Sequence, residues 1–336
     1  MARIGAVQAQ DYNAALWAVG LRCRGSTIGD IEKAIALGKI IRTWPLRQTL
    51  HFVSPRDVRW MLGFYPERKI PRYQRDNGLT DRSLVVGLGL VAKAFRKREF
   101  LSYSEMHKAL EGTGVPELDK TEVQSHVIRR AGRMGIICFG PHRGKSPTFT
   151  LLDNWVPRAA QMDKRRALGE LALRYFSSHG PATIQDYVWW SGLRVSEAAA
   201  GIEASVQKLR KEIFDGKTYY MRGRGASRSD SDAHLLPAFD EYLVGYKDRA
   251  AMLSNEKTQK MLRSGKIFFT HSNGIFLPTI VISGQVLGTW KCRHGKDKSV
   301  VSVTPFVRFG AVERSLVREA AQRYGEFIGK GIDVKV

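Results

Sequence analysis

The sequence predicts a mostly α protein with small β-hairpins (α+β), made of tandem winged-helix units followed by a small mixed α/β C-terminal region. One observation is a layout of helix, short capped helix, longer helix and two strand-like runs, which recurs along the chain. A second is the length of 336 residues, which is enough for two or three domains with their own cores. A third is the change after residue 222, where a Gly- and Ser-rich stretch precedes several β-prone runs.

The first winged-helix unit is expected at residues 1–75. Residues 6–22 and 26–37 have helical patterns, and residues 39–53 alternate like a pair of strands. The helix that normally opens such a unit is not evident in this stretch. We therefore expect a unit that lacks its first helix, or one in which residues 54–64 replace it.

The layout is clearest in the second unit, which is expected at residues 80–157. Apolar residues recur at helical spacing over residues 82–98. Ser102, with Glu105 three positions later, makes a capping box that opens the next helix. After a longer helix, two β-prone runs joined by the loop PHRGKSP predict a hairpin near residues 136–152.

The third unit is expected at residues 160–222. It repeats a long helix, a second helix opened by Thr183, a third helix, and a hairpin near residues 212–221 around an Asp-Gly turn. The stretch that follows, RGRGASRSDSDAH, is interpreted as a loop and not as a phosphate cradle, because no strand leads into a GK[ST] motif.

The C-terminal region, residues 235–336, is expected to be a mixed α/β domain. Its strand-like runs are GIFLPTIVISG, QVLGTWKCR and SVVSVTPFVRF, and an amphipathic helix over residues 311–328 follows them.

The charge of the chain points to nucleic acid as partner. Fifty-four Lys and Arg against 32 Asp and Glu give a formal net charge of +22, which attracts polyanions. A membrane surface would require a basic amphipathic helix, a polybasic tail or a lipidation site, and none is evident. We expect double-stranded DNA as partner, no membrane, no obligate protein partner, and a cytoplasmic, nucleoid-associated location, because no apolar signal core is seen.

Metal-dependent and cofactor-dependent chemistry is poorly supported. The three cysteines are far apart and form no CxxC pair, so they are expected to be reduced. The eight histidines show no HxxxH spacing. No Walker loop, nucleophile elbow or Ser-His-Asp arrangement can be assembled, and we expect neither a metal nor a cofactor.

Gln8 and Gln10, in GAVQAQDY, are the most unusual polar pair. Long amides near an apolar helix start are costly to bury unless they form hydrogen bonds. Because an amide has both a donor and an acceptor, two of them can orient a water molecule. A QxQ pair is common, however, and on its own it is more typical of a solvated helix start than of a catalytic site.

The chain contains, in this order, GAVQAQDYNAALWAVGLR, RTWPLRQTLHFVSPRDVRWML, LLPAFDEYLVGYKDR and LPTIVISGQVLGTWKCR. These segments resemble successive blocks of the tandem winged-helix DNA glycosylases of the AlkZ and YcaQ type, over nearly the whole chain. In that family a Gln-aliphatic-Gln element contributes to the active site, and one branch has Asp in place of the second Gln. The resemblance implies that Gln8 and Gln10 are catalytic, with Ala9 at the aliphatic position.

The resemblance also suggests supporting residues. Thr49 and His51 match a recurring Thr-Leu-His block, and Asp11 is a weaker candidate for a base. Related chains carry a helix ahead of the Gln motif that is not evident here. The segment QAQDY contains no Lys that could form a Schiff base, which favours a monofunctional glycosylase.

DNA contacts are expected on the long helix of the second unit, whose N-cap is Asp119 or Thr121. Arg129, Arg130 and Arg133 fall on the polar side of this candidate recognition helix. An ordinary solvated basic face is the alternative interpretation.

Two hairpins add further candidate DNA-binding residues. His142, Arg143 and Lys145 lie at the tip of the wing in the second unit, and Arg42 and Arg47 flank TWPL in the first hairpin. The overall charge of +22 favours phosphate contact for these cations.

The resemblance implies a DNA repair glycosylase that hydrolyses the N-glycosidic bond of alkylated, N7-type purines, with interstrand crosslinks as a further substrate. The competing hypothesis is a non-enzymatic winged-helix DNA-binding protein such as a transcriptional regulator. A third is a family member that has lost activity. Release of a modified base distinguishes the first from the other two.

Overall fold

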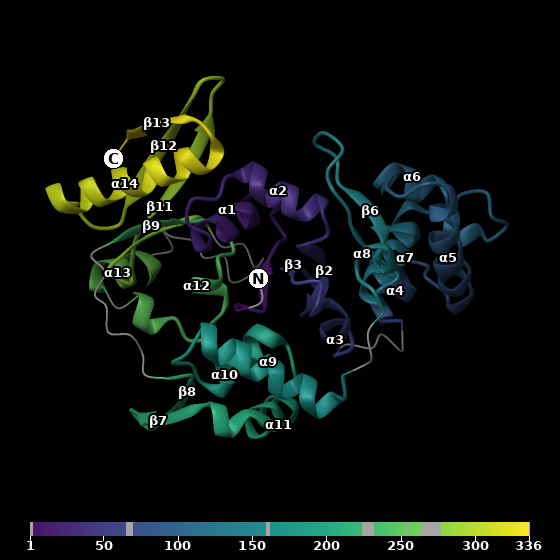
Figure 1. Ribbon diagram of the computed structural model, residues 1–336, viewed down its shortest axis with the longest axis horizontal. Helices are drawn as coiled ribbons and strands as arrows, with labels where there is room; N and C mark the ends of the chain where they lie inside the picture. The colour runs from purple at the N-terminus through teal and green to yellow at the C-terminus, as the bar shows by residue number, and fades with distance from the viewer. Residues whose placement is uncertain are drawn as a thin grey trace. The chain divides into compact units, whose positions relative to one another are not determined.

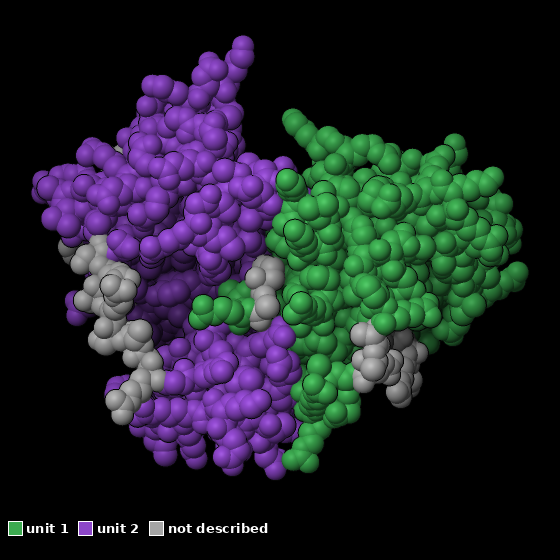
Figure 2. Space-filling view, in the orientation of Figure 1, with its two compact units in different colours: residues 1–6, 33–167 green, residues 7–32, 168–336 purple. Residues whose placement is uncertain are grey.

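The computed structural model describes residues 3–64, 70–158, 162–223, 232–253, 255–263 and 277–335. The chain forms two compact units (Figure 2): unit 1 comprises Met1–Ala6 and Lys33–Ala167, and unit 2 comprises Val7–Glu32 and Leu168–Val336. Of the structure described, 47% is helix and 22% is strand, which confirms the mostly helical α+β class.

The finer division into winged-helix units at residues 1–75, 80–157 and 160–222 and a C-terminal domain at 235–336 stays a prediction. Most of the predicted loop after residue 222, residues 224–231, lies outside the described residues. So does the GIF of the first C-terminal run.

Unit 1 contains a sheet in which β3, β2, β5, β6 and β4 follow one another, with antiparallel neighbours. Its strands are β2 (Ile41–Leu46), β3 (Thr49–Val53), β4 (Leu101–Ser102), β5 (Ile137–Phe139) and β6 (Thr148–Leu151). Its helices are α3 (Val58–Leu62), α4 (Arg72–Asp76), α5 (Asp81–Ala94), α6 (Tyr103–Lys108), α7 (Thr121–Arg133) and α8 (Leu152–Trp155), and α2 (Ile28–Ala36) ends in this unit. The hairpins predicted near residues 39–53 and 136–152 are confirmed.

Helix α7 is the centre of unit 1, and Figure 1 shows it among α5, α6 and the strands. A Cβ on Gly87 of α5 would lie 2.8 Å from Val127 of α7, so the two helices can approach closely only with glycine there. On another side of α7, a Cβ on Gly132 would lie 2.1 Å from the ring of Trp44. Strand β2 therefore packs directly against the last turn of α7.

Capping boxes open two of the helices for which the sequence predicted a cap. Ser102 and Glu105 form the predicted capping box at α6, and Thr183 and Asp186 form one at α10 (Ile184–Ser191). The predicted cap of α7 is wrong, because Lys120 occupies the N-cap position and makes no side-chain cap. Asp119 instead accepts a hydrogen bond from the Gly112 N–H at 3.0 Å, which fixes the preceding loop.

Unit 2 combines helices with a hairpin and a five-stranded sheet. The helices are α1 (Tyr12–Arg22), most of α9 (Lys164–Ser178), α10, α11 (Val195–Ser205), α12 (Glu241–Val244), α13 (Glu256–Arg263) and α14 (Ala311–Ile328). The hairpin predicted near residues 212–221 is confirmed as β7 (Arg210–Phe214) and β8 (Lys217–Met221). The sheet has the order β13 (Gly331–Lys335), β12 (Lys298–Pro305), β11 (Gln285–His294), β10 (Thr279–Ile282), β9 (Ala233–Leu236), and only β12 and β13 pair in parallel.

Helix α14 packs on β9 and β13 of the unit 2 sheet, and aromatic side chains join α1 to α14. The Trp17 ring lies 5.1 Å from the Tyr324 ring and 5.0 Å from the Phe327 ring. A Cβ on Gly20 would lie 2.5 Å from Phe327, so α1 can lie against α14 only with a glycine there. Helix α1, which follows the Gln motif, is thus part of the core of unit 2.

The predicted helix over residues 6–22 is wrong at its start. Residues Ala6–Gln8 form strand β1, and the helix begins only at Tyr12. The reason is Asp11, whose extended backbone and carboxylate make it the N-cap, so the residues before it leave the helix. Among the described residues, no helix is both long and apolar enough to cross a bilayer.

Candidate active site and DNA-contact residues

The Gln motif, Gln8-Ala9-Gln10, lies at the start of unit 2, where strand β1 ends at Gln8 and a bend at Gln10 leads into α1. Ala9 is fully buried, whereas Gln8 is half-buried and Gln10 is exposed. Each glutamine is therefore at least partly exposed, on either side of a fully buried alanine.

Asp11 has a structural function in the helix that follows. Its Oδ1 accepts a hydrogen bond from the Ala14 N–H at 3.0 Å and so caps α1. The side chain is exposed. This hydrogen bond satisfies one of the free N–H groups at the start of α1.

A buried carboxylate that we did not single out from the sequence contacts the motif directly. Glu241, the first residue of α12, is 1% exposed. Its Oε1 accepts a hydrogen bond from the Gln8 backbone N–H at 2.7 Å, and its Oε2 accepts one from Trp190 Nε1 at 2.9 Å. The Nε2 atom of His179 lies 3.6 Å from the same Oε2. The backbone at Gln8 is thus held from inside unit 2.

The neighbouring residue, Asp240, binds Arg22, which ends the helix that follows the Gln motif. It accepts two hydrogen bonds from the Arg22 guanidinium, each at 2.8 Å, and caps α12 through the Tyr242 N–H. Burial opposes the charge on Arg22, but Asp240 outweighs that effect and the pKa of Arg22 is raised. Between these ends, Trp17 Nε1 donates to the Leu235 carbonyl at 2.7 Å. Consecutive acidic residues thus fix both the start and the end of the stretch from Gln8 to Arg22.

Thr49 and His51 lie on β3 of unit 1, so they belong to a different unit from the Gln motif. His51 is fully buried, and its Nδ1 lies 2.9 Å from the Thr49 carbonyl. Because a carbonyl only accepts, His51 donates through Nδ1 in this contact. The other ring nitrogen, Nε2, lies 3.5 Å from Nη2 of Arg47.

The arginines of α7 do not share one exposed face. Arg129 is exposed, but Arg130 and Arg133 are 3% and 9% exposed, so the prediction that all three lie on an open basic surface is wrong for two of them. Trp44 packs at Gly132, between these two positions, and β2 therefore covers this side of the helix.

The candidate DNA-contact residues of the wing and of the first hairpin also include both exposed and buried side chains. Arg143 and Lys145 are exposed, although Arg143 also forms an ion pair with Glu105 at 3.3 Å. Arg42 is buried over the Phe139 ring, 4.7 Å from its centroid, and Arg47 is half-buried. Burial, and then the charge of Arg42, lower the pKa of His142, which favours its neutral form. Among the predicted DNA-contact residues, the exposed cations are Arg129, Arg143 and Lys145.

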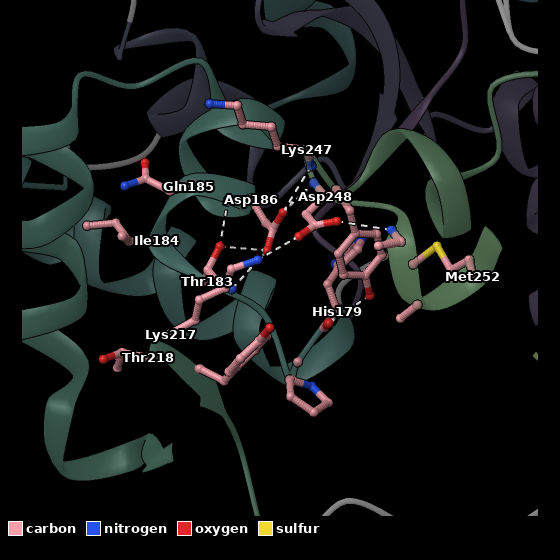
Figure 3. A pocket seen from close by; sticks show the side chains of 16 residues that line it. His179, Thr183, Ile184, Gln185, Asp186, Lys217, Thr218, Lys247, Asp248 and Met252 are labelled. Carbon is pink, nitrogen blue, oxygen red and sulfur yellow. Dashed lines mark hydrogen bonds and ion pairs between the residues drawn. The ribbon is translucent and has the colours of Figure 1, made fainter. Parts of the chain in front are cut away.

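A cavity of about 900 Å³ lies elsewhere in unit 2, beside the start of α10 and the residues after α12 (Figure 3). Asp186 at its base is 3% exposed, and both of its oxygens accept hydrogen bonds from the chain, from Thr183 on one side and from the Lys247 and Asp248 amides on the other. Its lining contains none of the predicted site residues. Within the described part of the chain, no three His, Cys, Asp or Glu side chains are grouped to hold a metal ion.

Comparison with known proteins places these features in a family. The interstrand DNA cross-link repair glycosylase of Streptomyces sahachiroi is 24% identical over 345 residues, covering 90% of this chain and 83% of that protein. The solved structure of the DNA glycosylase AlkZ from the same organism has a TM-score of 0.75 at 22% identity, covering 99% of this chain and 92% of that one. The family model for AlkZ-like DNA glycosylases matches residues 1–327. This match extends over nearly the whole chain, and the protein belongs to the AlkZ-like DNA glycosylase family.

Proposed function

We propose that this protein hydrolyses the N-glycosidic bond of N7-alkylated purines in duplex DNA, including purines in interstrand crosslinks, as a monofunctional glycosylase. The observation that carries the proposal is the Gln8-Ala9-Gln10 segment, in which a half-buried glutamine and an exposed one flank a fully buried alanine. Family membership supports glycosylase chemistry, and the Streptomyces relative named as a crosslink repair glycosylase supports the crosslink substrate.

Hydrolysis of this bond requires little assistance to the leaving group. A purine alkylated at N7 already carries positive charge and leaves readily, so the enzyme needs to position a water molecule and stabilise the positive charge that develops on the sugar. The amides of Gln8 and Gln10 can each accept a hydrogen bond from that water and direct its lone pair at the anomeric carbon. No covalent enzyme intermediate is required.

The supporting residues contribute less directly to this proposal. Asp11 carries a negative charge next to the motif while it caps α1, which favours an electrostatic contribution over proton abstraction. Thr49 and His51 stay candidate supporting residues. His51 is fully buried, so it would act through its neighbours and not by touching the substrate as the protein stands.

DNA binding is assigned to exposed cations. The exposed side chains of Arg129, Arg143 and Lys145 can contact phosphates without moving. The Arg47 side chain is half-buried, so only its exposed part can reach a phosphate. The buried side chains of Arg42, Arg130 and Arg133 would have to move before they could contact DNA, and the lowered pKa of His142 disfavours a positive charge on its ring.

The test is release of the modified base. Purified protein is incubated with a duplex that carries one N7-methylguanine, and free base is measured by mass spectrometry against the undamaged duplex. We expect release from the damaged duplex only, with an abasic site left and no strand cleavage. Tight binding without release from this substrate or from a crosslinked duplex would favour a non-enzymatic DNA-binding protein.

A further inference from the structure

We infer that Glu241 is a positioning residue for catalysis, which holds the Gln8-Ala9-Gln10 segment in its reactive geometry through the Gln8 backbone. The inference rests on the proposed function of the two glutamines. It adds a residue that lies 233 positions away in the sequence and is too deeply buried to touch substrate itself.

The hydrogen bonds of Glu241 require a carboxylate at this position. A backbone N–H and an indole N–H can only donate, and each faces a different oxygen of Glu241, at 2.7 Å from Gln8 and 2.9 Å from Trp190. An ionised carboxylate accepts both. A glutamine has one acceptor and one donor group, so it can satisfy only one of these partners and must turn an N–H toward the other.

The position of this charge fits catalysis better than a purely structural role. An ionised carboxylate that is 1% exposed is costly to bury, and an uncharged side chain could fill the same volume. Placed behind the motif, the charge orients the Gln8 peptide and favours positive charge developing at the reacting sugar. Asp240 beside it binds Arg22 at the far end of the stretch, so of these two acids it is Glu241 that acts on the Gln8 peptide.

The experiment compares Glu241→Gln and Glu241→Ala with a matched control, Asp186→Asn. Asp186 is likewise a buried, fully hydrogen-bonded carboxylate of unit 2, but the residues it contacts lie outside the Gln motif. Single-turnover base release from the N7-methylguanine duplex is measured at saturating protein, and the dissociation constant for the same DNA is measured separately. We expect release to slow about 10-fold in Glu241→Gln and about 100-fold in Glu241→Ala, while the dissociation constants stay within about twofold of wild type. Asp186→Asn should lower the unfolding midpoint but release base at the wild-type rate per folded molecule.

Two results would overturn the inference: wild-type release rates in both Glu241 variants, or a loss of rate matched by an equal loss in Asp186→Asn. If both Glu241 variants fail to fold, hydrogen exchange at the Gln8 amide of the wild-type protein decides, because an amide held by Glu241 is protected and one that exchanges at the random-coil rate is not held. Failure of the proposed function is recognised separately, because Gln8→Ala and Gln10→Ala would then release base at the wild-type rate.

Discussion

Replacing Asp240 by Asn should destabilise the protein by removing half of a buried ion pair. The Asp240 side chain is fully buried and receives two guanidinium hydrogen bonds of 2.8 Å from Arg22, whose side chain is 33% exposed. Asparagine keeps one acceptor and the helix cap, but turns an N–H toward the second guanidinium nitrogen. A hydrogen bond to a charged group contributes about 1.5–3 kcal/mol. Because Arg22 can turn partly to water, we expect a loss of about 2 kcal/mol.

For a unit of this size each kcal/mol lowers the melting temperature by about 2–4 °C, so Asp240→Asn should melt roughly 4–8 °C below wild type. Thermal unfolding followed by tryptophan fluorescence measures the shift. Lys217→Gln is the control, because it removes an ion pair of similar length, 3.0 Å to Asp248, whose side chains are 54% and 51% exposed. Its midpoint should not change measurably. Equal midpoints for the two variants would refute the argument that burial makes the Arg22 pair important.

Three further predictions test packing, binding and chemistry. Gly132→Ala should destabilise unit 1 by about 1–3 kcal/mol in urea unfolding, because the new methyl group meets the Trp44 ring at 2.1 Å; an unchanged midpoint would show that Trp44 moves freely. Arg129→Ala should lower the slope of log affinity against log salt by about one and leave single-turnover base release unchanged; an unchanged slope would exclude a phosphate contact. Gln10→Asp should retain partial base release with an altered substrate preference, since a carboxylate can still hold water and stabilise positive charge; complete inactivity toward a panel of alkylated duplexes would contradict this.

Local signals in the sequence predicted the elements they control. The Ser102–Glu105 and Thr183–Asp186 boxes open helices because the residues that bond are only three positions apart. The strands β1, β9 and β13 were missed, because β1 has three residues and the pairing of β9 and β13 depends on distant partners. Periodicity alone could not predict that β2 covers one side of α7.

The candidate site was predictable only in part. Gln8 and Gln10 came from a resemblance, because two amides carry no distinctive physical pattern. Glu241 was missed since its bond to Gln8 joins residues 233 positions apart. One signal could have indicated it: the Asp-Glu pair interrupts the apolar run LLPAFDEYLV, where buried charges need partners.

Single-turnover base release by Gln8→Ala and Gln10→Ala tests whether the two glutamines are catalytic. With the N7-methylguanine duplex fully bound, we expect each variant to release base about 100-fold more slowly than wild type, while the dissociation constant for the duplex stays nearly unchanged. If both variants release base at the wild-type rate, the two glutamines are not catalytic and the proposed mechanism is wrong.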